Sequence, residues 1–174
     1  MTALSGRDGH LLWSRTQGYV KTAPGGGALP NDMPPPPALA DRARGGVEDT
    51  VYVGDSEGKI WEFGASLGQG GVLYDVGPTP EGHTQPIGAP LALYRDRDNG
   101  HLMVAAVTGG TDWAAPSDTY SVYVIDVDAV DGQRGQRGVL RFQTPIKGRG
   151  YAAPVVSGYD LYVTGSEGLM GQSS

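Results

Sequence analysis

The chain has 174 residues, 39% of them hydrophobic, which is enough for one globular domain with a sizeable core. Its formal net charge of −6 and its 13 scattered basic residues argue against nucleic acid as a partner, because phosphate contacts need clustered Lys and Arg. The absence of cysteine excludes disulfides, zinc–thiolate sites and cysteine nucleophiles.

Glycine and proline interrupt the chain throughout. The 29 glycines and 13 prolines are typical of many short strands joined by turns. No segment of about a dozen residues keeps a helical hydrophobic period. No apolar run approaches the ~20 residues that a membrane-spanning helix needs. We therefore expect an all-β protein without a membrane span.

The first residues read MTALSGRDGHLLWSR. They lack the basic head and apolar block of a signal peptide, so we expect that any leader of an exported protein lies outside this chain. Residues 1–16 predict the two outer strands of a sheet. Residues 17–35 predict a Gly/Pro-rich surface loop.

The stretch VYVGDSEGKIWEF, residues 51–63, predicts two strands joined by a tight turn. Gly58 supplies the positive φ that such a turn needs, because glycine has no Cβ to clash. The second strand alternates apolar and polar residues. This alternation places Trp61 on a packed face of the sheet, as a structural residue.

The turn recurs along the chain. Tyr52-Val-Gly-Asp-Ser-Glu-Gly58 aligns with Tyr162-Val-Thr-Gly-Ser-Glu-Gly168, so Gly168 takes the structural role of Gly58. AVTGG lies halfway, with Ala106 opposite the tyrosines. The spacing indicates an internal repeat of about 55 residues.

Each repeat predicts four short antiparallel strands, which is the signature of a β-propeller blade. Residues 36–76 form one blade, residues 88–143 another, and residues 152–174 part of a third. Together with residues 1–16 they amount to about three blades, whereas closed propellers have about four to eight. We expect a propeller fragment with an incomplete ring, and open blade edges through which chains could self-associate.

The stretch ALSGRDGHLLW resembles the tryptophan-docking motif of PQQ-type propellers. Ala3, Gly9 and Trp13 stand at the positions of the motif, while Ser5 and Asp8 replace its usual Asp and Thr. In such motifs the tryptophan packs flat on a peptide plane of the neighbouring blade. The resemblance implies that Trp13 ties one blade to the next.

Residues 47–128 resemble the C-terminal propeller of the PilY-type proteins of type IV pilus assembly and adhesion. The matching stretches, in order, are VYVGDSEGKIWEF, QPIGAPLAL, LMVAAVTGG and SVYVIDVD. The resemblance implies a non-enzymatic scaffold in the periplasm or on the surface of a bacterium, often with calcium. Its partners would be pilus components or a host or surface ligand.

Two alternatives remain open. One is a fragment of a PQQ-dependent quinoprotein dehydrogenase, which would need a complete ring, a central calcium and a catalytic Asp. The other is a PQQ-like periplasmic scaffold that helps assemble outer-membrane proteins. The sequence assigns no catalytic residue, because His10, His83 and His101 have no partner apparent from spacing and neither a nucleophile elbow nor a phosphate loop is present.

Calcium is the one metal that the sequence suggests, and no other cofactor is assigned. Asp126, Asp128 and Asp131 follow a strand, and three carboxylates on a glycine-rich loop could hold Ca²⁺, which prefers oxygen ligands. Their spacing is out of register with an EF-hand loop. Asp96-Arg-Asp98-Asn99-Gly100 predicts a hairpin turn rather than a second calcium loop.

Residues 109–120, GGTDWAAPSDTY, form a longer connection than the matching turns. Loops that outgrow their repeat often carry recognition. Trp113 and its neighbour Asp112 are the candidate partner-binding residues, since tryptophan offers a large contact area with few rotamers. The alternative is that Trp113 folds back over the blade edge and only covers it.

Overall fold

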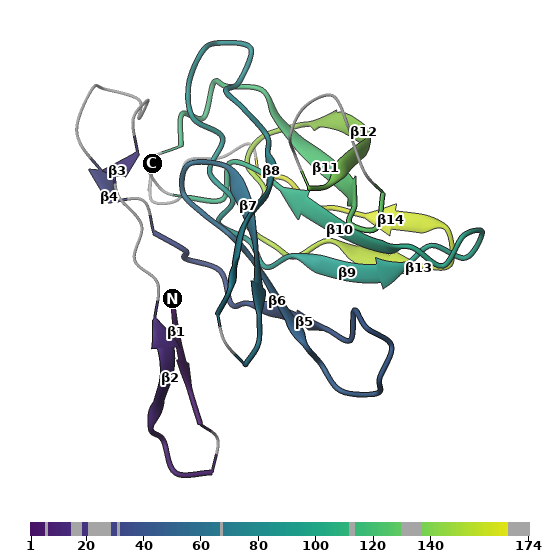
Figure 1. Ribbon diagram of the computed structural model, residues 1–174. Coiled ribbons are helices and arrows are strands. Elements are labelled where there is room, and N and C mark those ends of the chain that lie inside the picture. The colour runs from purple at the N-terminus through teal and green to yellow at the C-terminus, as the bar shows by residue number, and fades with distance from the viewer. Residues whose placement is uncertain are drawn as a thin grey trace.

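The computed structural model describes residues 1–5, 7–14, 19–20, 29–30, 32–66, 68–111, 114–129 and 137–166. Throughout these ranges the regular structure is antiparallel β-sheet and no helix forms, so none of the described segments is a helix that could cross a membrane (Figure 1). The all-β prediction is confirmed.

Two four-stranded sheets make up most of the molecule, and each is an antiparallel meander in chain order. The first sheet consists of β5 (Ala38–Ala40), β6 (Thr50–Gly54), β7 (Lys59–Gly64) and β8 (Gly70–Asp75). The second consists of β9 (Ala92–Arg95), β10 (Leu102–Val107), β11 (Tyr120–Asp126) and β12 (Val139–Ile146). The first lies within the predicted residues 36–76, and the second begins within the predicted residues 88–143 and extends past them to Ile146.

Three two-stranded hairpins complete the fold. They are β1 (Thr2–Leu4) with β2 (Leu11–Ser14), β3 (Tyr19–Val20) with β4 (Leu29–Pro30), and β13 (Val155–Ser157) with β14 (Asp160–Tyr162). The β1–β2 pair agrees with the two strands expected in residues 1–16, and β13–β14 falls in the segment expected to be a partial sheet.

The sheets stack face to face in chain order. The main core fills the space between the two four-stranded sheets, with Tyr52, Ile60, Leu73, Val104, Tyr123 and Ile125 among its members. Behind the first sheet, Trp13 of the β1–β2 hairpin packs on Val51 and Phe63. Beyond the second sheet, Leu161 of β14 packs on Met103. Each four-stranded sheet thus has apolar packing partners on both faces.

The same backbone contact joins successive sheets. The N–H of Ile87, in the segment that enters the second sheet, donates to the carbonyl of Asp55 at 3.0 Å. The N–H of Gly150, in the segment that leads toward β13, donates to the carbonyl of Thr108 at 3.1 Å. Asp55 and Thr108 therefore occupy equivalent places in the two sheets.

This equivalence corrects the predicted alignment by one residue. If Asp55 matches Thr108, then Tyr52 matches Ala105, and the expected match with Ala106 is wrong. Successive side chains of a strand point to opposite faces, so a one-residue shift exchanges the faces. Tyr52 and Ala106 line the same core from its two sides, whereas Tyr52 and Ala105 both face the following sheet.

The β6–β7 turn is built around a buried aspartate. The carboxylate of Asp55 accepts hydrogen bonds from the N–H groups of Glu57 and Lys59 and from Nε1 of Trp61, the last at 2.7 Å. Gly58 has φ +88°, as predicted, and a Cβ there would lie 2.7 Å from the carbonyl oxygen of Gln85. Gly168, the predicted counterpart, lies outside the described residues.

Both tryptophans that were predicted to be structural pack at the first sheet. Nε1 of Trp13 donates to the carbonyl of Ala65 at 3.0 Å, and its ring lies so close to Gly68 that a Cβ there would come within 2.5 Å of it. Trp13 therefore lies against the backbone of the β7–β8 turn. Trp61 is half-buried and stacks on Phe63, with 5.9 Å between ring centroids.

We expect Trp13→Ala to lower the free energy of unfolding by about 3–5 kcal/mol, because the change empties a buried site and removes the bond to Ala65. Urea denaturation followed by circular dichroism measures the loss. Leu12→Ala is the control, since Leu12 is the neighbouring residue and is 46% exposed. Equal midpoints for the two variants would contradict a docking role for Trp13.

Candidate functional site

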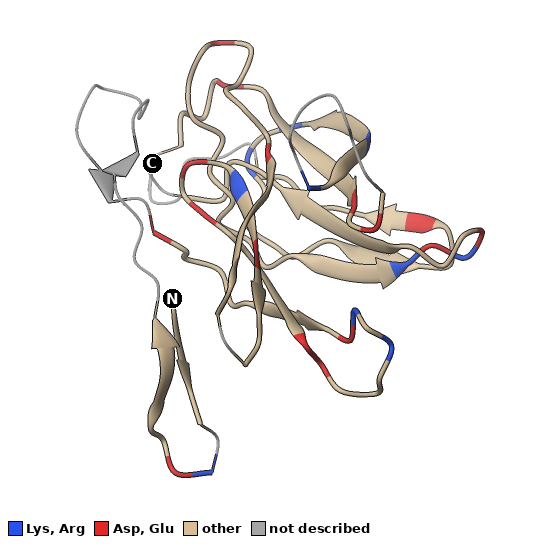
Figure 2. Ribbon diagram, viewed as in Figure 1, with Lys and Arg blue, Asp and Glu red and all other residues tan. Residues whose placement is uncertain are grey.

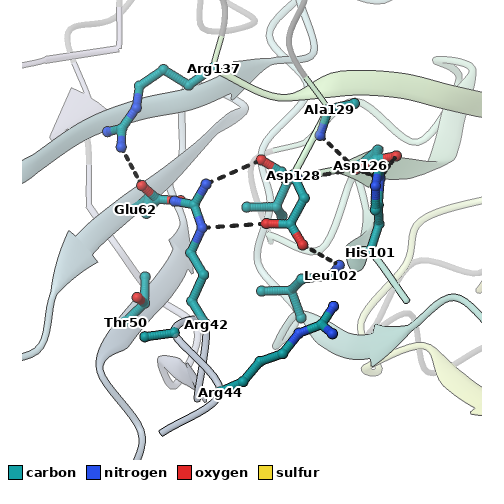
Figure 3. A network of polar contacts seen from close by, with 12 residues as sticks. Arg42, Arg44, Thr50, Glu62, His101, Leu102, Asp126, Asp128, Ala129 and Arg137 are labelled. Carbon is teal, nitrogen blue, oxygen red and sulfur yellow. Dashed lines mark hydrogen bonds and ion pairs between the residues drawn. The ribbon is translucent and has the colours of Figure 1, made fainter. Parts of the chain in front are cut away.

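A network of ion pairs joins the two four-stranded sheets at one margin of their shared core (Figure 3). Glu62 of β7 is almost fully buried, and a carboxylate so placed needs cationic and hydrogen-bonding partners. Its Oε2 accepts from Nη1 of Arg42 at 2.7 Å and from the hydroxyl of Tyr52 at 3.0 Å. Arg137, just before β12, donates to Oε1.

Arg42 connects the first sheet to the second. Besides Glu62, its guanidinium reaches Oδ1 of Asp128 at 3.5 Å and the carbonyl of Val127 at 3.4 Å. Asp128 follows β11 and also accepts the N–H of Leu102 at 2.8 Å, while Arg95 lies 3.8 Å from its Oδ2. Asp128 is therefore held by partners from both sheets.

Asp126, at the end of β11, is completely buried. Oδ2 lies 2.9 Å from Nδ1 of His101 and accepts from Arg141, while Oδ1 accepts the N–H groups of Asp128 and Ala129. Burial opposes the charged form of this carboxyl, but the hydrogen bonds from His101, Ala129 and Arg141 outweigh burial and lower the pKa of Asp126 below its usual value.

Of the three predicted calcium ligands, the structure describes Asp126 and Asp128. Asp126 and Asp128 are close in the chain, but their carboxylates face different cationic partners, and Asp131 lies outside the described residues. In the ranges given above, no three His, Asp or Glu side chains cluster as metal ligands do. Calcium at these positions stays a prediction, and it would have to compete with arginines for the same oxygens.

Each of the three histidines has an acidic partner in the structure, although none was apparent from the spacing of residues. His10 Nδ1 lies 2.6 Å from the Asp8 carboxylate in an exposed turn, and His101 pairs with Asp126. His83 Nδ1 lies 2.8 Å from Oδ2 of Asp118, whose side chain is buried. Asp118 is 35 residues from His83 in sequence, so spacing carried no signal for this pair.

The candidate partner-binding residues, Asp112 and Trp113, lie outside the described residues, so their roles stay predictions. The segments on either side of them are anchored. Nη1 of the buried Arg149 donates to the carbonyls of Thr111 at 3.5 Å and Ala114 at 3.2 Å, and the hydroxyl of Tyr120 donates to the carbonyl of Ala115 at 3.0 Å. The described residues that border Asp112 and Trp113 are therefore held in place by hydrogen bonds.

The hairpin interpretation of residues 96–100 is confirmed. The N–H of Gly100 donates to the carbonyl of Asp96 at 2.8 Å, and the N–H of Asp98 donates to the Asp96 carboxylate. This carboxylate closes its own turn. The segment connects β9 to β10, as its sequence predicts.

The charged residues of the described ranges lie on both loops and strands, with both signs interspersed (Figure 2). Within the network, the guanidinium groups are paired with carboxylates. The network therefore acts as a polar contact that connects the two sheets. No protein-family model matches the chain, and no curated protein is significantly similar to it. Functional assignment therefore depends on the geometry and on the residues themselves.

We expect Glu62→Ala to cost about 1–3 kcal/mol of unfolding free energy, because the change removes the carboxylate that Arg42 and Arg137 contact and leaves the buried hydroxyl of Tyr52 without its acceptor. Urea denaturation measures the cost. Glu81→Ala is the control, because Glu81 is an exposed carboxylate that bonds Thr119 instead of an arginine. A Glu62→Ala midpoint equal to that of the control would contradict the network.

The depressed pKa of Asp126 predicts a pH dependence. A carboxyl whose pKa is lower in the folded than in the unfolded state stabilises the fold above the unfolded value, about 3.9, and this stabilisation disappears as the pH falls through the folded pKa. Asp126→Asn should therefore flatten the fall in stability at acidic pH. Urea midpoints measured from neutral pH downwards test this, and an unchanged slope would contradict it.

Proposed function

We propose that the chain is a sector of a β-propeller and serves as a non-enzymatic interaction scaffold, of the kind found in PilY-type proteins of type IV pili. One observation carries the proposal: four-stranded antiparallel meanders stack face to face in chain order, with the same backbone bond between successive sheets. Meanders of this kind are the blades of propellers.

The placement of Trp13 supports the PQQ-like class of propellers. Its indole N–H bonds the backbone of the next sheet and its ring lies against Gly68, which is the contact that the docking motif predicts. The ion pairs support a scaffold rather than an enzyme. Glu62 and Asp126 are buried and neutralised, whereas a general acid or base needs access to a substrate.

We place recognition in the loop that carries Asp112 and Trp113. The residues that flank it are held by Arg149 and Tyr120, so a partner would meet a loop with a fixed base. A rigid base lowers the entropy lost on binding. Partners of this class would be pilus components or a host or surface ligand, met in the periplasm or at the bacterial surface.

The proposal is tested by measuring binding of purified type IV minor pilins to the immobilised chain, with and without calcium. Trp113→Ala should weaken binding by about 2 kcal/mol, or roughly thirtyfold, and leave the melting temperature nearly unchanged. Phe142→Ala is the control, because it removes an exposed aromatic side chain from β12.

Two results would contradict this proposal. The first is equal weakening by Trp113→Ala and Phe142→Ala, which would place recognition elsewhere. The second is dye-linked alcohol oxidation after addition of PQQ and calcium, which would make the chain part of a quinoprotein dehydrogenase.

A further inference from the structure

The C-terminal hairpin exposes a position that both complete sheets bury. Tyr162 of β14 is 58% exposed, whereas Tyr52 of β6 and Ala105 of β10 are 0% exposed. The three residues are equivalent, because each lies in the second strand of its sheet and its side chain points away from the sheet before it. Tyr52 and Ala105 are covered by the sheet that follows.

Strand pairing confirms the equivalence. The cross-strand partner of each residue lies in the first strand of the same sheet: Tyr52 pairs with Ala38, Ala105 with Ala92, and Tyr162 with Val155. Ala38 and Ala92 contribute to the cores that the following sheets close. Val155, by contrast, is 60% exposed. The hairpin therefore presents an apolar cross-strand pair to solvent.

The turn beyond β14 is exposed in the same way. The N–H of Ser56 donates to the carbonyl of Asp32, in the segment that enters the first sheet, and the N–H of Ser166 donates to the carbonyl of Arg149, in the segment that enters the β13–β14 hairpin. This match sets Gly165 equivalent to Asp55. Asp55 is buried and bonded by the segment that enters the next sheet, whereas Gly165 is exposed.

The opposite end of the stack has a complementary exposed residue. Leu39 of β5 is 54% exposed on the rear face of the first sheet, where it pairs with Val51. The β1–β2 hairpin covers that face over β6 and β7, because Trp13 packs on Val51 and Phe63. In the second sheet the matching residue is Leu93, which pairs with Val104 and packs into the main core.

We propose that the β13–β14 hairpin of one copy docks on the rear face of the first sheet in a second copy, beside β1–β2. Val155 and Tyr162 would then lie on Leu39, and all three exposed apolar residues would be covered. The occupant is a second copy because this chain itself offers both halves of the contact. The inference rests on the stacking of the sheets and does not need the pilus assignment.

The strand count fits this joint. Among the described residues, β14 pairs only with β13 and β1 pairs only with β2, so each hairpin has one edge that no described strand pairs. Free edges expose unpaired N–H and C=O groups that bind further strands. The β13–β14 hairpin of one copy and the β1–β2 hairpin of the other would together make a four-stranded sheet like the two complete ones.

The two surfaces differ, so the contact is heterologous and repeats head to tail. Two copies form a closed dimer when the β13–β14 hairpin of each copy docks on the first sheet of the other. We therefore expect a dimer with two identical joints. Such a dimer would bury Leu39 and Tyr162 of both copies.

Sedimentation velocity over a dilution series tests the proposal. The wild-type chain should sediment as a dimer, and Tyr162→Asp and Leu39→Asp should each weaken dimerisation by about thirtyfold or more, as hot-spot substitutions do. Both residues are exposed in the single chain, so circular dichroism should be unchanged. Val47→Asp is the control, because Val47 is 72% exposed in the β5–β6 connection and should leave the dimer intact.

Mixing the two variants separates this joint from other modes of association. The Tyr162→Asp chain keeps an intact Leu39 face, and the Leu39→Asp chain keeps an intact hairpin, so a mixture should form a heterodimer through one wild-type joint. A monomeric wild-type chain would overturn the proposal. So would variants that still dimerise alone, or a mixture that stays monomeric.

Discussion

The structure depends on the burial of apolar side chains between sheets stacked face to face. β6 and β10 are buried at every position, so neither can be stabilised by a single neighbouring sheet. Burial yields about 25 cal/mol for each Å² of apolar surface, and large side chains such as Tyr52 and Tyr123 contribute most to it. This requirement explains why the β1–β2 and β13–β14 hairpins cover the outer faces of the two complete sheets.

The ion-pair network lies at the margin of the same interface and helps to fix how the two sheets are oriented relative to each other. Desolvating buried charges costs roughly as much as their attraction returns, so we attribute to the network the alignment of the sheets rather than most of their stability. Arg42 illustrates the constraint, because its guanidinium must reach Glu62 and Asp128 at the same time. Only a narrow range of relative placements of the two sheets satisfies both contacts.

Local patterns were enough to predict the strands of the two four-stranded sheets, whereas β3 and β4 lie in residues 17–35, which were expected to be a loop. The alternation in KIWEF, the glycine at position 58 and the Asp-Asn-Gly sequence before β10 each act within a few residues, and the structure confirms the elements that they predict. The sequence alignment places the middle repeat one residue out of register, because AVTGG retains too few of the residues that mark the repeat around Tyr52. Only the contacts of Asp55 and Thr108 with the following segments established its register.

The sequence by itself therefore determined the class of the fold, the strand-rich repeat and the glycine-dependent turn at Gly58. The tertiary structure alone decided which side chains meet. The pairs His101–Asp126, His83–Asp118 and Arg42–Val127 are 25, 35 and 85 residues apart in sequence. Their physical cause is the stacking of sheets, which brings together strand ends that no local period relates.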